Sequence, residues 1–269
     1  MDYLVAANAH ATARQQSLAT WIAAHGGQDF LNQWQVAVDL TQGQLAQAHQ
    51  LVHQMLPAGP AAGDKFSLAS ALAFLAVADA AYGQRARAIG EASAALRLVP
   101  RLQPVLDPAA TALALAGDTA TADRLNLELE QNFGHISQVA LVDLPCNRAL
   151  VALAHHQPAA ATTMLAPVQP YDDGNWGAGE PAYLLGLALA DQHQYAPAVT
   201  AFQHALAVRT PTPTFFHPLA QLGLARALAA SGQAAAARQA YAALLQSWDH
   251  ADPTLPAVRQ ARAEARRLP

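Results

Sequence analysis

The sequence predicts an all-α protein built from stacked helical hairpins, and three observations carry this prediction. The chain has 269 residues, of which 53% are apolar and only 6% aromatic. Much of the apolar share is alanine, so the composition favours helix nearly throughout. Turn sequences recur at a nearly constant spacing, and small residues follow each turn at fixed distances. We therefore expect a single solenoid domain over residues 1–269 with one continuous core.

A turn that ends one helix and begins the next recurs six times. The six turns begin at Gly43, Gly83, Gly117, His156, His193 and Gly232. Successive turns are 40, 34, 39, 37 and 39 residues apart, and alanine stands three and five residues after each of them. These spacings match one helix–turn–helix unit per repeat. Glycine at four turns supplies a left-handed residue without a steric penalty from Cβ, and histidine replaces it at the other two.

The stretch over residues 183–211, YLLGLALADQHQYAPAVTAFQHALAVRTP, resembles a tetratricopeptide repeat residue by residue. Gly186 follows Leu185 as in the family's Leu-Gly pair, and Ala198 takes the small position at the helix crossing. Phe202 takes the position of the aromatic knob. The resemblance implies two antiparallel helices whose backbones approach closely where the side chains are small.

Extended to the whole chain, the resemblance implies a right-handed superhelix of about six such hairpins over residues 30–251. A capping helix is expected at each end, over residues 2–25 and 253–268. The C-terminal helix places Arg259, Arg262 and Arg266 along one face, which is typical of the solvated end of a solenoid.

The C-terminal half also resembles the tetratricopeptide region of bacterial eukaryotic-like serine/threonine kinases. Residues 222–268 and 147–172 carry this resemblance, and residues 28–131 follow it more weakly. The chain has no glycine-rich nucleotide loop, lysine-bearing strand or His-Arg-Asp loop, so no kinase chemistry transfers. The resemblance implies a sensory or docking module that regulates a kinase or a transcription regulator.

Charge and cysteine content exclude several classes of function. The formal net charge is −4 with only 15 Lys and Arg, which gives no general attraction for nucleic acid. The single cysteine, Cys146, requires no oxidising compartment. No secretory signal and no apolar stretch of about 20 residues is present. We expect a soluble, cytoplasmic chain with no nucleic-acid or membrane partner.

The concave groove of such a superhelix is lined by the first helix of each hairpin, so the turn register predicts its lining. The predicted groove residues are Gln33, Ala73, Val77, Asp107, Thr111, Cys146, Leu150, Tyr183, Leu187, Leu222 and Arg226. Only Arg226 could grip a terminal carboxylate, which needs several fixed donors. A helix or extended peptide with apolar anchors fits this lining better. The alternative is that these residues only pack against neighbouring repeats.

The segment at 167–181 is too long for a plain turn. It contributes a predicted contact surface made of Tyr171, Asp172, Asp173, Trp176 and Glu180, an aromatic pair with three carboxylates. The alternative is an ordinary connection in which Trp176 folds back onto the next hairpin.

Candidate metal and catalytic residues are few. His49 and His53 lie one helical turn apart, but Gln50 stands where a zinc protease needs glutamate, and no third ligand is near in sequence. Cys146 follows Pro145 near a predicted helix start, where the helix dipole would lower the pKa of the thiol. We expect a protein-binding scaffold that has no cofactor, no metal and no catalysis. An all-helical hydrolase that uses His and Cys remains a remote alternative.

Overall fold

The computed structural model describes residues 28–55, 62–173, 177–209 and 214–268, with the side chains of residues 28–34, 55 and 62–64 outside this description. All regular elements in these ranges are helical, which confirms the all-α fold class. The expected capping helix over residues 2–25 lies outside the described residues. Among the described helices, none is both long and apolar enough to cross a membrane.

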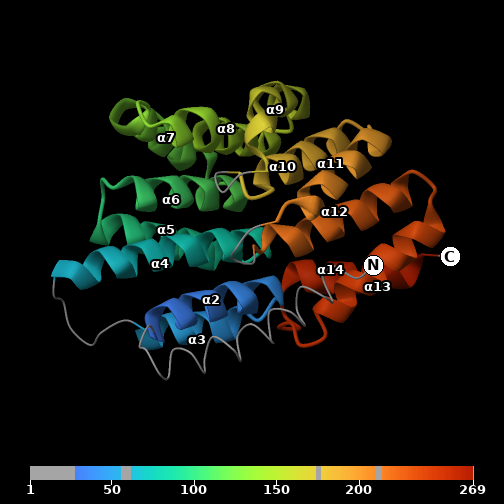
Figure 1. The fold of residues 1–269 in the computed structure, drawn as a ribbon, viewed down its shortest axis with the longest axis horizontal. Coiled ribbons are helices and arrows are strands. Elements are labelled where there is room, and N and C mark those ends of the chain that lie inside the picture. The colour runs from blue at the N-terminus through green and yellow to red at the C-terminus, as the bar shows by residue number, and fades with distance from the viewer. Residues whose placement is uncertain (1–27, 56–61, 174–176, 210–213, 269) are drawn as a thin grey trace.

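Thirteen α-helices in the described residues pack as six sequential hairpins followed by a last helix (Figure 1). The hairpins are α2 (Gln28–Thr41) with α3 (Leu45–Met55), α4 (Ala62–Ala81) with α5 (Arg85–Leu98), α6 (Gln103–Ala116) with α7 (Thr119–Phe133), α8 (Leu144–Ala154) with α9 (Pro158–Leu165), α10 (Glu180–Asp191) with α11 (Tyr195–Ala207), and α12 (Phe216–Ala230) with α13 (Ala234–Ser247); α14 (Pro256–Arg267) is the last helix. The first helices α4, α6, α8, α10 and α12 lie side by side in that order. Each of α5, α7, α9 and α11 packs against the first helix of the following hairpin.

The six predicted turns share one backbone geometry. Gly43, Gly83, Gly117 and Gly232 have φ between 71° and 90°, and His156 and His193 have φ of 57° and 59°. In every turn, the amide that follows the left-handed residue donates to the carbonyl five residues earlier, over 2.7–2.9 Å. This bond caps the C-terminus of the first helix. The turn prediction is therefore confirmed, including the two turns where histidine replaces glycine.

The third and fourth hairpins begin in different ways. The third hairpin begins at Gln103, and Pro108 lies inside α6. Pro104 occupies the first turn of α6, where a missing N–H is harmless. Asp143 does not cap the fourth hairpin, because it ends a π-helical turn, η1 (Val139–Asp143), that runs directly into α8.

Phe202 of α11 is the aromatic knob that the repeat resemblance implied, and it is fully buried. A Cβ built on Gly186 of α10 would lie 2.6 Å from its ring, and a Cβ on Gly223 of α12 would also collide with the ring. The close approach at Gly186 was predicted from the sequence, whereas the role of Gly223 was not. Phe202 thus packs between glycines of two successive hairpins.

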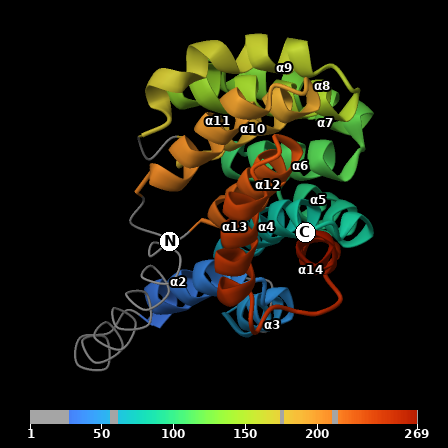
Figure 2. The same ribbon diagram turned by 90° about the vertical axis from the view of Figure 1, so that its right-hand side faces the viewer.

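The C-terminal segment closes onto the turns of the first two described hairpins (Figures 1 and 2). Trp248 is fully buried, and its indole Nε1 donates to the carbonyl of Thr41 over 3.2 Å. Asp252 N donates to the Gly43 carbonyl over 2.9 Å, and Ala46 N donates to the Asp252 carboxylate over 2.8 Å. The first and last hairpins are therefore joined by hydrogen bonds between residues about two hundred positions apart in the chain.

Helix α14 has one buried face and one exposed face. Its residues Ala257, Val258 and Ala261 are buried, and a Cβ on Gly83 would lie 2.9 Å from Pro256 Cβ. The opposite face carries the predicted arginines, of which Arg259 and Arg266 are exposed and Arg262 is partly buried. The small residues of α14 and the missing side chain at Gly83 allow this close packing.

The packing around Phe202 gives a testable difference between two helical glycines. We expect Gly186→Ala to lower the free energy of unfolding by roughly 1–3 kcal/mol, because the buried ring cannot move away from the added methyl group. A Cβ added to Gly90 of α5 would meet no atom within 4 Å, so Gly90→Ala should raise it by about 0.5–1 kcal/mol through helix propensity. Urea unfolding followed by circular dichroism measures both. Equal effects of the two substitutions would contradict the packing described here.

Candidate binding groove

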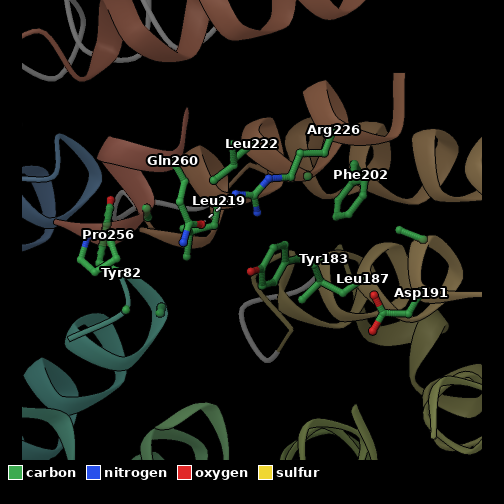
Figure 3. Close-up of a pocket in the computed structure, with 15 residues that line it drawn as sticks. Tyr82, Tyr183, Leu187, Asp191, Phe202, Leu219, Leu222, Arg226, Pro256 and Gln260 are labelled. Atoms are coloured by element: carbon green, nitrogen blue, oxygen red, sulfur yellow. Dashed lines mark hydrogen bonds between the residues drawn. The ribbon is translucent and has the colours of Figure 1, made fainter. Parts of the chain in front are cut away.

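Two cavities lie against the first helices of the hairpins. One, of about 270 Å³, lies between the end of α4 and helices α10, α12 and α14 (Figure 3). The other, of about 560 Å³, lies between the C-terminal ends of α6 and α8, the start of α5 and helix α10. Leu187 of α10 lines both cavities. We name the two cavities together the groove.

The structure divides the predicted groove residues into three groups. Tyr183, Leu187, Leu222 and Arg226 line the smaller cavity, and Leu150 and Leu187 line the larger one. Ala73, Val77, Thr111 and Cys146 are buried in the packing, and Asp107 is partly buried. The Gln33 side chain lies outside the described residues. Packing against neighbouring repeats, the alternative reading of the pattern, thus accounts for Ala73, Val77, Thr111 and Cys146.

Several residues that line the groove were not predicted. Tyr82, Pro256 and Gln260 complete the smaller cavity, whereas Arg85, Leu153, His155 and His156 complete the larger one. The residues from α14 had no sequence signal, since nothing in the repeat pattern places the last helix beside the end of α4. Arg85 and His155 flank predicted turns and His156 is itself a predicted turn residue, so the turn register could have indicated all three.

Arg226 already binds a carboxylate within the chain. Its Nε and Nη2 donate to the two carboxylate oxygens of Glu264 over 2.9 and 3.0 Å, and Nη2 also donates to Gln260 over 3.1 Å. The hydroxyl of Tyr241 donates to the same carboxylate over 2.9 Å. This two-point pair fixes α14 against α12. The one predicted groove cation is therefore paired with Glu264 of the C-terminal helix itself.

Beyond one end of the groove, α6, η1 and α10 bring together acidic side chains. Burial, with the neighbouring Asp143, raises the pKa of Asp107 to about 7. Burial raises the pKa of Asp143 to about 6, and burial with the charges of Asp107 and Asp143 raises that of Glu180 to about 8. Asn147 Nδ2 donates to Asp107 over 2.9 Å, and the Asn147 side-chain oxygen accepts from the Thr111 hydroxyl over 2.6 Å. These carboxyls therefore hold protons more tightly than exposed ones.

Cys146 does not have the reactive thiol that its position in the sequence indicated. Its side chain is only 3% exposed. Burial, together with the nearby Glu180, Asp107, Asp143 and Asp172, raises the pKa of the thiol well above its usual value. The effect of these groups outweighs the expected influence of the helix dipole, so the predicted lowering of the pKa is wrong. A buried, protonated thiol is a poor nucleophile.

The segment at 167–181 is only partly a surface. It begins with a 3₁₀ helix, η2 (Ala166–Tyr171), and Tyr171 and Glu180 are partly buried. Asp172 is 3% exposed and accepts from the amide of Ala182 over 3.0 Å, so it satisfies a free N–H in the first turn of α10. Asp173 remains exposed, 3.3 Å from His204 Nε2. Trp176 lies outside the described residues.

Comparisons with known proteins place the chain in no family. No protein-family profile matches it, and the search of curated proteins found no match. Among solved structures, the chain is similar to the TPR domain of P58(IPK), with a TM-score of 0.40 and 16% sequence identity over 96% of this chain and 83% of that one. The architecture described above rests on the helix order, the six turns and the packing of this chain.

The raised pKa of Glu180 predicts a pH dependence of stability. The unfolded carboxyl has a pKa of about 4.3, so between that pH and about 8 the folded state binds more protons and stability falls as pH rises. Glutamine cannot ionise. Between pH 6 and 8 we therefore expect the free energy of unfolding to fall by on the order of 1 kcal/mol less in Glu180→Gln than in the wild type. Urea unfolding at several pH values measures this, and Asp123→Asn on the exposed face of α7 is the control. A Glu180→Gln curve parallel to the wild type would contradict the prediction.

Proposed function

We propose that this chain is a non-catalytic scaffold that binds a peptide segment of a partner protein in the groove. The architecture of stacked helical hairpins supports a binding role, since such repeats present extended concave surfaces to other proteins. The buried, protonated Cys146 thiol supports the absence of covalent catalysis. A single buried cysteine also fits a reducing compartment such as the cytoplasm.

The observation that carries the proposal is the way in which α14 packs against the groove. A short helix there buries small apolar residues and places Glu264 on Arg226. The edge of the groove thus accepts a helix that combines an apolar face with a carboxylate. An external peptide of the same chemistry would find comparable contacts along the larger cavity.

The larger cavity has the chemistry that such a peptide needs. Leu150, Leu153 and Leu187 supply apolar lining. Arg85 and His155 also line the cavity and add polar groups. Arg85 is exposed and makes no ion pair with another described residue. We infer that the partner inserts an apolar anchor against the leucines and presents an acidic side chain to Arg85.

A pair of matched substitutions tests the proposal. Leu187→Glu places a charge at the point shared by the two cavities, whereas Leu127→Glu makes the same change on α7, where Leu127 is 52% exposed. We expect partners that bind both the wild type and Leu127→Glu to bind Leu187→Glu at least about tenfold more weakly, because a buried unpaired charge is costly. Immobilised chains with mass spectrometry identify such partners, and titration with each purified partner measures the change.

If Leu187→Glu and Leu127→Glu retain every partner equally, the groove is not the binding site. Arg85→Glu then separates the charge contribution from the apolar one. If only apolar contacts matter, Arg85→Glu should leave partner affinity unchanged, and the acidic part of the proposed ligand would be wrong.

A second candidate rests on the resemblance of residues 222–268 to the C-terminal region of bacterial serine/threonine kinases. In this case the scaffold regulates a kinase or a transcription regulator. Binding of the purified chain to a kinase encoded in the same gene neighbourhood, measured with Leu187→Glu as the comparison, would support it. The absence of such a gene or of such binding would speak against it.

A further inference from the structure

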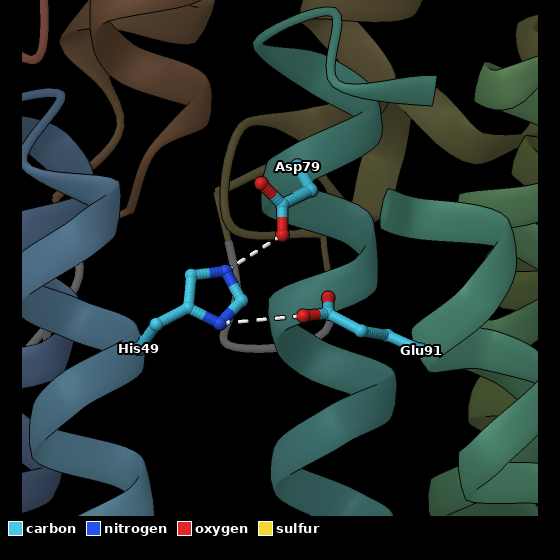
Figure 4. Close-up of side chains that lie close together, drawn as sticks. All are labelled: His49, Asp79 and Glu91. Atoms are coloured by element: carbon cyan, nitrogen blue, oxygen red, sulfur yellow. Dashed lines mark hydrogen bonds and ion pairs between the residues drawn. The ribbon is translucent and has the colours of Figure 1, made fainter. Parts of the chain in front are cut away.

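A histidine and two carboxylates converge where the first described hairpin meets the second (Figure 4). His49 of α3 lies between Asp79 of α4 and Glu91 of α5, with its Nε2 2.7 Å from Asp79 Oδ2 and its Nδ1 3.3 Å from Glu91 Oε1. The three side chains are 12%, 0% and 15% exposed. One donor atom from each residue can be chosen so that all three lie within 4.8 Å of one another.

The hydrogen bonds of the cluster are incomplete. Asp79 Oδ1 and Glu91 Oε2 are buried and have no hydrogen-bond partner. The nearest cation to Asp79 Oδ1 is Arg87, whose Nη1 is 3.7 Å away on a side chain that is 46% exposed. Buried carboxylate oxygens without partners are costly. Asp79 is completely buried and directs Oδ2 toward His49, whereas its unsatisfied Oδ1 lies on the side of the carboxylate that faces away from the histidine (Figure 4).

We propose that His49, Asp79 and Glu91 bind one divalent transition-metal ion of the Zn²⁺ type. One imidazole nitrogen and two carboxylates form a donor set that zinc accepts, and water completes four-coordination. Two bonds of about 2.0 Å at a tetrahedral angle place ligand atoms about 3.3 Å apart. Donor atoms that now lie within 4.8 Å of one another must move by about 1.5 Å or less relative to one another to reach that spacing.

The ion would join three helices that come from two hairpins. His49 stands on the second helix of the first described hairpin, and the two carboxylates stand on both helices of the next one. A shared ion would fix this junction, which follows a connection outside the described residues. The role is structural, so it is independent of partner binding in the groove.

This site could not be predicted from the sequence because its ligands are distant along the chain. The spacing of His49 and His53 is typical of metal ligands, but His53 is exposed and is not part of the cluster. The structure supplies the missing ligands from positions 30 and 42 residues after His49. The expectation that the chain has no metal rested on the absence of a third ligand near in sequence, and the structure provides two.

Titration of the purified chain of 269 residues with Zn²⁺, after treatment with a chelator and buffer exchange, tests the proposal. We expect one ion per chain by calorimetry and a rise in Tm of about 5 °C at a Zn²⁺ concentration near 100 times Kd. Mg²⁺ at the same concentration should have little effect, because a site with an imidazole ligand does not suit it. His49→Ala should weaken Zn²⁺ binding at least about 100-fold and Glu91→Gln at least about tenfold.

His53→Ala is the matched control, since this exposed histidine lies one turn further along α3. It should bind Zn²⁺ like the wild type. Glu91→Gln keeps the shape of the side chain and an acceptor for His49, so a folded variant by circular dichroism is expected even if His49→Ala is unstable. No binding by the folded wild type, or equal binding by the wild type and Glu91→Gln, would overturn the proposal and leave a histidine held between two carboxylates by hydrogen bonds alone.

Discussion

The burial of Trp248 against the turn of the first described hairpin is the contact on which the shape of this chain depends. Its indole N–H donates to the Thr41 carbonyl, and the centroids of the Trp248 and Tyr82 rings are 5.7 Å apart. Tyr82 in turn donates its hydroxyl to the carbonyl of Leu40. Three segments that are far apart in sequence thus meet around two large aromatic side chains, and burial of this much apolar surface outweighs the loss of chain freedom.

This closure places α14 against the smaller cavity, which the end of α4, α10 and α12 also line. With Trp248 fixed, the following residues cross the turns at Gly43 and Gly83, and α14 comes to lie beside α12. The pair between Arg226 and Glu264 then holds the helix in place. The smaller cavity is therefore lined by residues from both ends of the described solenoid, whereas the larger cavity has no lining residue from α14.

The sequence predicted the local geometry well and the long-range geometry poorly. The turns, the hairpins and the knob at Phe202 follow from local periodicity and from residues that must be small, so one stretch was enough to set the register. The closure at Trp248, the buried Asp172 and the cluster at His49 depend on contacts between distant hairpins, which no spacing along the chain encodes. The shift in the pKa of the Cys146 thiol was predicted in the wrong direction. Besides burial, the thiol is affected by carboxyls on other elements, such as Glu180 and Asp107, which its position in the sequence does not reveal.

A pair of engineered cysteines at positions 43 and 251 tests the closure most directly. A Cβ built on Gly43 lies 2.9 Å from Ala251 Cβ, which is roughly 1 Å shorter than the Cβ separation of a typical disulfide, so the left-handed turn at Gly43 must shift slightly for the bond to form. The double substitution Gly43→Cys with Ala251→Cys should form an intramolecular disulfide under mild oxidation in the folded chain, with faster migration on a non-reducing gel, and should not form it in denaturant. Persistence of both introduced thiols, beside that of Cys146, in the folded chain would show that its ends stay apart, and would contradict the closure.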